Sequence, residues 1–234
     1  MTTPVRPADD AVGGMTTLLV IAKEPVPGRV KTRLTPPYTP AQAAALAEAA
    51  LADTLAAVAA TPAARRVLVL AGRAGRWLPE GFEVIPQRGG GLDERLANAF
   101  HDAGGPAVLV GMDTPQVTPA ALTRAAQSLD DGDAVFGPAA DGGFWLLGLR
   151  EPAPRLFLGV PMSRPDTGAH LRARLRGLRV TTLGTLTDVD TAADAVRVAA
   201  QAPGTRFAAA LAGIGRAEGP HEPVGSDPAQ GGAR

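Results

Sequence analysis

The sequence predicts an α/β fold of three layers, in which helices cover both faces of a doubly wound, mostly parallel β-sheet. One observation behind this prediction is that short apolar runs alternate along the chain with longer segments of helical periodicity. A second is that charged or glycine-rich segments follow several of these runs, as at the ligand-binding carboxyl edge of parallel sheets. Such alternation typically builds parallel strands joined by helices.

The expected strands are short runs rich in valine, leucine and phenylalanine. They lie at residues 16–22, 66–71, 82–86, 107–111, 133–136, 144–149 and 178–183. The run at 107–111 is the most apolar of them. We therefore expect that run to be at the centre of the sheet, where both faces of a strand are buried.

The longer segments between these runs are expected to be helices. They lie at about 40–60, 92–103, 119–129, 166–176 and 191–201, with a short amphipathic piece at 205–216. Thr39 and Thr118 each precede a proline at the first helical position, which makes them expected N-caps. For the helix at 191–201 the N-cap is open between Asp190 and Thr191.

Composition excludes several classes of function. The chain has 234 residues, with 23 Lys and Arg against 23 Asp and Glu, and no cysteine. The balanced charge argues against a non-specific nucleic-acid binder, because such proteins need a basic field. The lack of cysteine excludes disulfides, thiolate catalysis and cysteine-ligated zinc. The three histidines lie far apart in sequence and lack the spacing of metal ligands.

The length suits one domain, which we expect at residues 15–216. Residues 1–14 and 217–234 lack periodicity and are rich in Gly, Pro and polar residues, so a disordered arm and a disordered tail are expected there. The first residues lack the apolar core of a signal peptide, and no apolar run is long enough to span a bilayer. The sequence thus predicts a soluble, cytoplasmic protein without a membrane or nucleic-acid partner, and it leaves a homodimer open.

A basic loop follows the first expected strand and is the feature around which the chain is organised. Its four cations are Lys23, Arg29, Lys31 and Arg33. The loop also holds Gly28 and only one acid, Glu24. A strand, a basic glycine-containing turn and a helix form a common phosphate site at a sheet edge, although this loop matches neither a Walker nor a dinucleotide motif. The alternative is a solvated basic loop.

Three acids follow other expected strands. Asp113 comes after the 107–111 run, and Asp188 and Asp190 come after the run at 178–183. Two acids spaced i, i+2 on an extended segment point to the same side, so all three acids suit one shared divalent cation, Mg²⁺ or Mn²⁺. The alternatives are that Asp113 is a turn residue before Thr-Pro and that Asp190 is a helix cap.

Two glycine-rich segments are candidate ligand contacts. In the first, Asp141, Gly142 and Gly143 would let an acceptor approach the backbone, with Trp145 as a wall and Asp141 as a candidate base. Its alternative is an ordinary turn into a strand with buried aromatic residues. In the second, the glycines at 89–91 precede a helix and either contact a nucleotide or acceptor or form only a loop.

Together these segments resemble a known family, over about residues 15–200. The matching segments are AKEPVPGRVKTRL (22–34), GLDERLANAF (91–100), VGMDTPQVTP (110–119), GPAADGGFWLLGLR (137–150) and TDVDT (187–191). The chain resembles the bacterial glycosyltransferase-A-like proteins grouped as a domain of unknown function. These are similar to 2-phospholactate guanylyltransferase and to molybdenum-cofactor nucleotidyltransferases. One departure is Ala192-Ala193, where the family usually has Pro-Glu.

The resemblance implies a glycosyltransferase-A-like, Rossmann-like fold that binds a nucleotide against the first loop. The implied nucleotide-binding residues are Ala22, Lys23, Gly28, Arg29, Lys31, Arg33 and Gly91. The implied metal is Mg²⁺ or Mn²⁺, held by Asp113 with help from Asp188 and Asp190. Lys31, Asp113 and Asp141 are the candidate catalytic residues, and Asp141, Gly142, Gly143 and Trp145 are the candidate acceptor-binding residues.

Three functions are consistent with these residues. The first is a metal-dependent transferase that uses a nucleoside-diphosphate sugar and a small-molecule acceptor, with the cations and the metal stabilising the departing diphosphate. The second is a nucleotidyltransferase that joins a nucleoside triphosphate to a small phosphorylated acid and releases pyrophosphate. The third is a non-catalytic nucleotide-binding module. Paired acids near phosphates argue against the third, because such acids need a metal to be tolerated.

Overall fold

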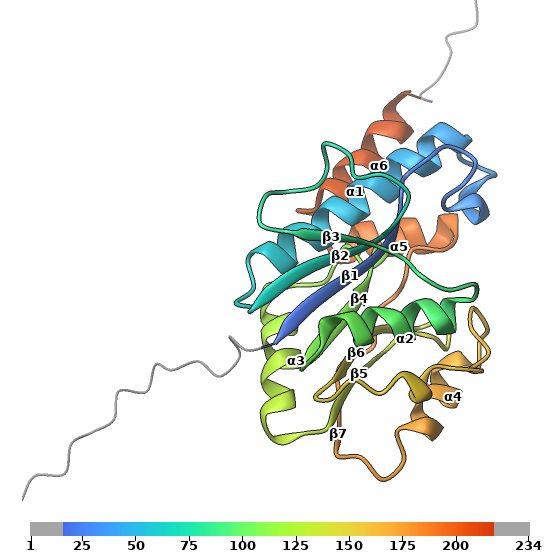
Figure 1. Ribbon diagram of the computed structural model, residues 1–234. Coiled ribbons are helices and arrows are strands. Elements are labelled where there is room, and N and C mark those ends of the chain that lie inside the picture. The colour runs from blue at the N-terminus through green and yellow to red at the C-terminus, as the bar shows by residue number, and fades with distance from the viewer. Residues whose placement is uncertain (1–15, 218–234) are drawn as a thin grey trace, which may run out of the picture.

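The computed structural model describes residues 16–217, in which one mixed sheet lies between layers of helices (Figure 1). The predicted arm at 1–14 and the predicted tail at 217–234, apart from Ala217, lie outside the described residues. The strands are β1 (Thr17–Lys23), β2 (Arg65–Ala71), β3 (Glu83–Pro86), β4 (Ala107–Gly111), β5 (Ala134–Pro138), β6 (Phe144–Leu149) and β7 (Val180–Thr182). Their order in the sheet is β3-β2-β1-β4-β6-β5-β7.

The apolar strand β4 lies at the centre of this order, which confirms the prediction for residues 107–111. It pairs with β1 in parallel and with β6 in antiparallel orientation. Strand β6 is also antiparallel to β5, whereas the pairs β1–β2, β2–β3 and β5–β7 are parallel. The sheet is therefore mostly parallel, with β6 as its one reversed strand among the described residues. Strand β7 is shorter than predicted because it is an exposed edge strand with only β5 beside it.

Helices cover both faces of the sheet, as the sequence predicts (Figure 1). They are α1 (Pro40–Ala59), α2 (Leu92–Ala103), α3 (Pro119–Asp131), α4 (Thr167–Arg174), α5 (Ala192–Gln201) and α6 (Arg206–Ala217), with short 3-10 turns η2 (Thr32–Leu34) and η3 (Pro154–Leu156). Leu18 and Val20 of β1 join the core cluster with α1 and α3, while Leu19 joins the cluster with α2 and α4. Alternate residues of β1 thus face opposite layers, which is the pattern of a strand buried on both faces.

Threonine caps begin the helices at the predicted places. Thr39 caps α1 and Thr118 caps α3, each accepting a hydrogen bond from a backbone N–H of the first turn. Thr191 caps α5 in a reciprocal arrangement with Asp194. Since Thr191 caps the helix, the choice between Asp190 and Thr191 is settled, and the Asp190 carboxylate is left for other contacts.

A third cluster ties the C-terminal helices to the loop after β1. Phe207 of α6, Val198 of α5, Leu34 of η2 and Val189 are buried together against α1. The Asp53 carboxylate of α1 accepts hydrogen bonds from the backbone N–H groups of Arg206 (3.0 Å) and Phe207 (2.8 Å), which begin α6. The two segments that carry Lys31 and Asp190 therefore have a common apolar anchor.

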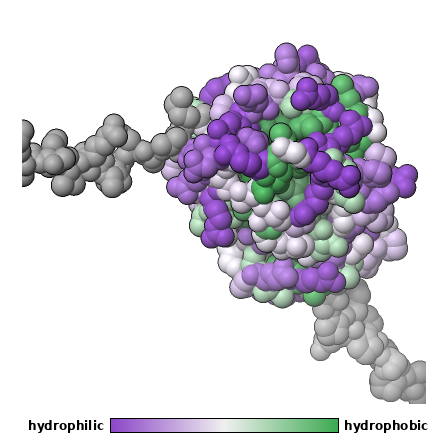
Figure 2. All heavy atoms as spheres, turned by 90° about the horizontal axis from the view of Figure 1, so that it is seen from below, coloured by the Kyte–Doolittle hydropathy of each residue, from purple (hydrophilic) through white to green (hydrophobic). Residues whose placement is uncertain are grey.

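Of the described helices, α1 alone is long and apolar enough to cross a membrane. Its most apolar window is 56% buried inside the protein, as expected for a core helix. On the face shown in Figure 2, apolar surface gathers in one recess bordered by hydrophilic side chains.

Candidate active site

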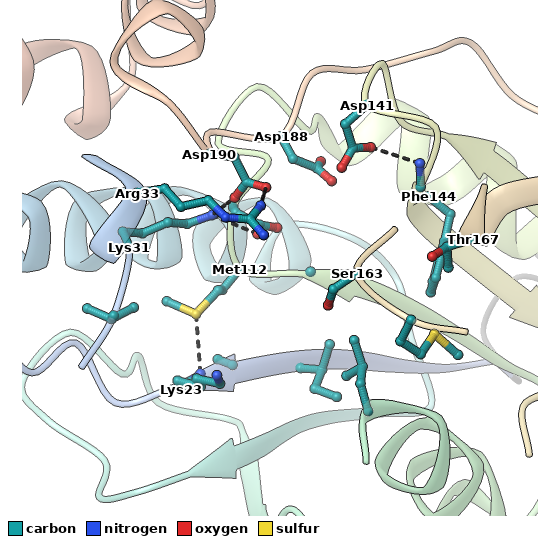
Figure 3. A pocket seen from close by; sticks show the side chains of 18 of the residues that line it. Lys23, Lys31, Arg33, Met112, Asp141, Phe144, Ser163, Thr167, Asp188 and Asp190 are labelled. Carbon is teal, nitrogen blue, oxygen red and sulfur yellow. Dashed lines mark hydrogen bonds and ion pairs between the residues drawn. The ribbon is translucent and has the colours of Figure 1, made fainter. Parts of the chain in front are cut away.

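The basic loop reaches the carboxyl ends of the central strands through Lys31. This residue has a left-handed backbone (φ 47°) at the start of η2, and the next turn is anchored by the fully buried Leu34. Its ammonium group donates to Asp113 Oδ2 and to Asp190 Oδ1, both at 2.9 Å (Figure 3). Only 10% of the Lys31 side chain is exposed. A buried cation with two carboxylate partners differs from the solvated loop that the sequence also allowed.

The other loop cations are more open. Arg33 lies 3.4 Å from Asp190 Oδ2 with 68% of its side chain exposed. Lys23 and Arg29 are exposed and have no side-chain partner within residues 16–217. Charged groups without partners at a sheet edge can bind an anion without first giving up a protein contact.

The three predicted metal ligands meet at one edge of the sheet. Asp113 follows β4, and its carbonyl oxygen accepts from Val189 N at 2.9 Å. Val189 is only 2% exposed, so the apolar core holds the segment between Asp188 and Asp190 in place. The two acids on either side of Val189 are thereby brought beside Asp113 from distant parts of the chain.

The side chains of Asp188 and Asp190 do not point to the same side, which corrects the i, i+2 prediction. Figure 3 shows Asp190 turned toward Lys31 and Asp188 turned toward Asp141. Within residues 16–217, no three acidic or histidine side chains form a group that could hold a metal ion. The physical reason is that the Lys31 ammonium already neutralises Asp190, and the segment is not the flat strand on which the prediction was based.

Asp188 is the acid in this group that has no hydrogen bond or ion pair among the described residues. Its Oδ1 atom is buried and has no hydrogen-bond partner among the described residues. Burial, then the neighbouring carboxylates of Asp113 and Asp141, raise the pKa of Asp188 to about 9, although Lys31 acts in the opposite direction. An orphaned carboxylate oxygen beside another acid suits a divalent cation, so Asp188 and Asp113 fit the implied metal.

Lys31 and Asp190, in contrast, stabilise each other's charged forms. Burial by itself would lower the Lys31 pKa, but the carboxylates of Asp113 and Asp190 outweigh burial and raise it. Burial would likewise raise the Asp190 pKa, but Lys31 and Arg33 lower it below its ordinary value. Both members of the pair therefore stay charged at neutral pH.

Asp141 lies in a turn that is held by close backbone packing. Its Oδ1 accepts from Gly143 N at 2.8 Å. A Cβ on Gly142, whose φ is 87°, would lie 1.9 Å from the carbonyl oxygen of Pro165. Gly168 N donates to the Gly142 carbonyl at 2.8 Å. The glycine at 142 is thus required by this contact with the segment before α4, and the contact fixes where the Asp141 carboxylate points.

Trp145 is not in the wall of the cavity, which corrects the predicted acceptor contact. It is 3% exposed, packs in the core with α1 and α3, and donates its indole N–H to Gly184 O at 3.0 Å. Successive residues of β6 point to opposite faces, so Phe144 faces the cavity where Trp145 cannot.

These elements enclose one cavity of about 850 Å³ along the carboxyl edge of the sheet. The predicted residues that line it are Ala22, Lys23, Arg29, Lys31, Arg33, Asp113, Asp141, Gly143, Asp188 and Asp190. Gly28, Gly91, Gly142 and Trp145 are outside its lining. Figure 3 shows Lys23, Lys31 and Arg33 at one end and Asp141, Phe144 and Thr167 at the other.

Several lining residues were not predicted from the sequence. Gln87 donates its side-chain N–H to the carbonyls of Ala22 (2.8 Å) and Val69 (3.2 Å), which closes the end of β1. Arg95 donates to Gln87 Oε1 and to the carbonyls of Gly89 and Gly90, which orders the glycine-rich turn. Their position next to the glycine-rich turn at 89–91 is the feature of the sequence that could have identified both residues.

The segment before α4 supplies Met162, Ser163 and Arg164 to the other end of the cavity. Nothing in their local sequence marks them, because the contact between Gly142 and Pro165 brings them to the site.

Comparison with known proteins identifies the family and agrees with the fold. A family model described as "Uncharacterized protein conserved in bacteria (DUF2064)" matches residues 44–164, about half of the chain. A crystal structure from Desulfovibrio desulfuricans G20, provisionally named a nucleotide-diphospho-sugar transferase, is 28% identical with a TM-score of 0.77, and the match covers 86% of this chain and 95% of that one. None of the curated proteins matches the chain.

Two more distant structures share the fold alone. CMP:2-keto-3-deoxy-manno-octonic acid synthetase, solved with CTP, is 14% identical with a TM-score of 0.53, and the match covers 81% of this chain and 98% of that one. A nucleotidyl transferase from Methanothermobacter is 19% identical with a TM-score of 0.53, over 80% and 97% of the two chains. The mostly parallel fold is thus of the kind found in sugar transferases and nucleotidyltransferases.

Proposed function

The chain belongs to the DUF2064 family of bacterial proteins, and from that premise we propose that it is a metal-dependent transferase that moves a sugar from a nucleoside-diphosphate sugar to a small-molecule acceptor. The observation that supports this most is the separation of charge between the two ends of the cavity of about 850 Å³. Free cations lie at one end, and an orphaned buried carboxylate faces a second carboxylate at the other. The name of the 28% identical structure points the same way.

At the donor end, Lys23, Arg29 and Arg33 bind the diphosphate. Lys23 and Arg29 have no side-chain partner in the described chain, so a phosphate gains their charge without breaking an ion pair. Each charge-assisted contact of this kind stabilises binding by roughly 1.5–3 kcal/mol. The Arg33 guanidinium is exposed and held only weakly by Asp190, so it can turn to the ligand.

Asp113 and Asp188 are the residues that would hold a divalent cation. When bound, the cation would neutralise charge that develops on the leaving diphosphate. Lys31 keeps Asp113 in position through its 2.9 Å contact, and it takes Asp190 as its second partner. We therefore assign Asp190 to the support of Lys31 and not to the metal.

Asp141 is the proposed base. The acceptor hydroxyl oxygen forms a bond to the anomeric carbon of the sugar while the bond from that carbon to the diphosphate oxygen breaks. The diphosphate leaves with the electron pair of the broken bond, and the hydroxyl proton passes to the Asp141 carboxylate. The hydrogen bond from Gly143 N to Asp141 Oδ1 leaves Oδ2 available for that proton.

The test is to incubate the protein with a panel of nucleoside-diphosphate sugars and Mg²⁺ and to measure the release of nucleoside diphosphate. One sugar nucleotide should be consumed slowly by water, and Asp113→Asn should abolish the reaction while the thermal unfolding temperature stays close to that of wild type. Nucleotide binding without any turnover across the panel and its acceptors would favour a non-catalytic module.

The second candidate is a nucleotidyltransferase that joins a nucleoside triphosphate to a phosphorylated acid. The observation in its favour is the group of loop cations, which would also suit the phosphates of a triphosphate. Release of pyrophosphate that depends on one phosphorylated acid would overturn the sugar-transfer proposal in favour of this one.

A further inference from the structure

The two ends of the cavity differ in which charges are already paired. Six cations line the cavity, and Lys23 and Arg29 at the donor end are the ones without side-chain partners in residues 16–217. At the opposite end, Arg164 is held by both carboxylate oxygens of Asp166, at 3.0 and 3.3 Å. Arg95, which lies beside Gln87 near the end of β1, is committed to Gln87 and to two glycine carbonyls. The charge of Arg164, the cation next to Ser163 in sequence, is therefore already matched by Asp166.

Carboxylates dominate the acceptor end. Asp141 and Asp188 face each other across it, and neither is in an ion pair within the described chain (Figure 3). A cation held by Asp113 and Asp188 would neutralise those two acids but would not contact the Asp141 carboxylate. An anionic group placed within reach of the proposed base would be repelled by this carboxylate.

Apolar side chains and the hydroxyl of Ser163 complete this end, where the Thr167 hydroxyl is already bonded to Pro161 O. Phe144 and Met162, which pack against the same core cluster, line the cavity there. Ser163 has a left-handed backbone (φ 58°), which is uncommon for a residue other than glycine, and its hydroxyl points into the cavity (Figure 3). Residues held in this conformation cluster at ligand sites, and Ser163 is exposed to the cavity side of the loop before α4.

We propose that the acceptor is an uncharged molecule that combines a hydroxyl group with an apolar portion, and that Ser163 and Asp141 select it. The apolar portion packs on Phe144 and Met162, the Ser163 hydroxyl hydrogen-bonds a polar group of the acceptor, and the reacting hydroxyl faces Asp141. This inference depends on the proposed sugar transfer, and it excludes the phosphorylated acid that the nucleotidyl alternative requires.

The experiment compares neutral probes with their own phosphate esters. The probes are phenyl β-glucoside and octanol, paired with phenyl β-glucoside 6-phosphate and octyl phosphate. Binding of each is measured by calorimetry on protein saturated with a nucleoside diphosphate and Mg²⁺. At least one neutral probe should bind the wild type at least about tenfold more tightly than its ester, a difference of about 1.4 kcal/mol.

Three variants separate charge from shape. Asp141→Asn should reduce the preference for the neutral probe over its ester to about threefold or less. The ester should bind more tightly because the substitution removes the repelling carboxylate and keeps the shape of the side chain. Ser163→Gly is compatible with the left-handed backbone. It should lower the affinity for the neutral probe at least about threefold and leave the affinity for the nucleoside diphosphate unchanged. Asp131→Asn removes a charge at the exposed end of α3, outside the cavity, and should change none of these values.

The outcomes separate this inference from the proposed function. If the wild-type protein does not bind any nucleotide, the proposed function itself is wrong. If the nucleotide binds but both esters bind as well as or better than their neutral partners, or no neutral probe binds, the acceptor inference is wrong while the donor site stands. An unchanged preference in Asp141→Asn would also overturn it.

Discussion

Asp188 and Asp190 are separated by one residue, yet they lie in opposite electrostatic surroundings. Asp190 contacts Lys31 and Arg33 and has a lowered pKa, whereas Asp188 has a buried oxygen without a partner and a pKa raised to about 9. The Lys31 side of the cavity is held by ion pairs, and the Asp141 side is held by backbone packing. The difference shows that the spacing of two acids in sequence does not decide their roles. The charged groups that surround each carboxylate in the fold decide them.

The largest expected effect comes from breaking the Lys31 side. Lys31→Met keeps the apolar stem but leaves Asp113 and Asp190 without their shared cation, so we expect a loss of about 3 kcal/mol in the free energy of unfolding. The measurement is urea denaturation in chelator. Arg33→Met is the matched control and should cost no more than about 0.5 kcal/mol, because that ion pair is exposed. Equal losses in the two variants would show that Lys31 is not a buried bridge.

The Asp141 side can be broken without touching a charge. Gly142→Ala places a Cβ against Pro165 O and should destabilise the protein by about 2–3 kcal/mol. Gly28→Ala shares the left-handed backbone (φ 75°) but meets no atom within 4 Å, so it should cost only about 1 kcal/mol. Urea denaturation of both variants isolates the packing contact, and equal costs would contradict it.

The raised pKa of Asp188 predicts a pH dependence in metal-free protein. Between about pH 4 and pH 9 the folded state binds a proton that the unfolded state has released, so stability falls as the pH rises. We expect a decrease of about 1–3 kcal/mol between pH 6 and pH 8.5, and a clearly smaller decrease in Asp188→Asn. Thermal unfolding in chelator at several pH values tests this, and parallel curves for the two proteins would rule it out.

The smallest effect concerns the apolar anchor of the Lys31 side. Asp53→Ala removes the two acceptors that begin α6, and loss of such a cap costs about 1 kcal/mol. The exposed neighbour Glu48→Ala is a control on the same helix and should be nearly neutral. Guanidinium denaturation measures both, and a neutral Asp53→Ala would mean that α6 does not depend on this contact.

Local patterns were enough to predict most of the fold. The caps at Thr39 and Thr118, the prolines that follow them and the apolar run at 107–111 depend on near neighbours in sequence, and the structure agrees with them. The reversed direction of β6 and the shortness of β7 depend on partners distant in sequence, so local patterns do not predict them.

The candidate site was predictable only as a set of segments. The loop after β1 and the acids at 113, 188 and 190 were placed at one edge by the logic of a parallel sheet. The alternation at Phe144 and Trp145 was visible, but which of the two faces the cavity depends on where the helices pack. Ser163 reaches the site through the contact between Gly142 and Pro165, which leaves no local signature.

The central claim is that Asp188, and not Asp190, holds the divalent cation together with Asp113. The direct measurement is titration of the protein with Mn²⁺ alone, with free Mn²⁺ followed by electron paramagnetic resonance, for wild type, Asp188→Asn and Asp190→Asn. Asp188→Asn should weaken Mn²⁺ binding at least about tenfold, and Asp190→Asn no more than about threefold. An equal loss in both variants, or a larger loss in Asp190→Asn, would contradict the assignment.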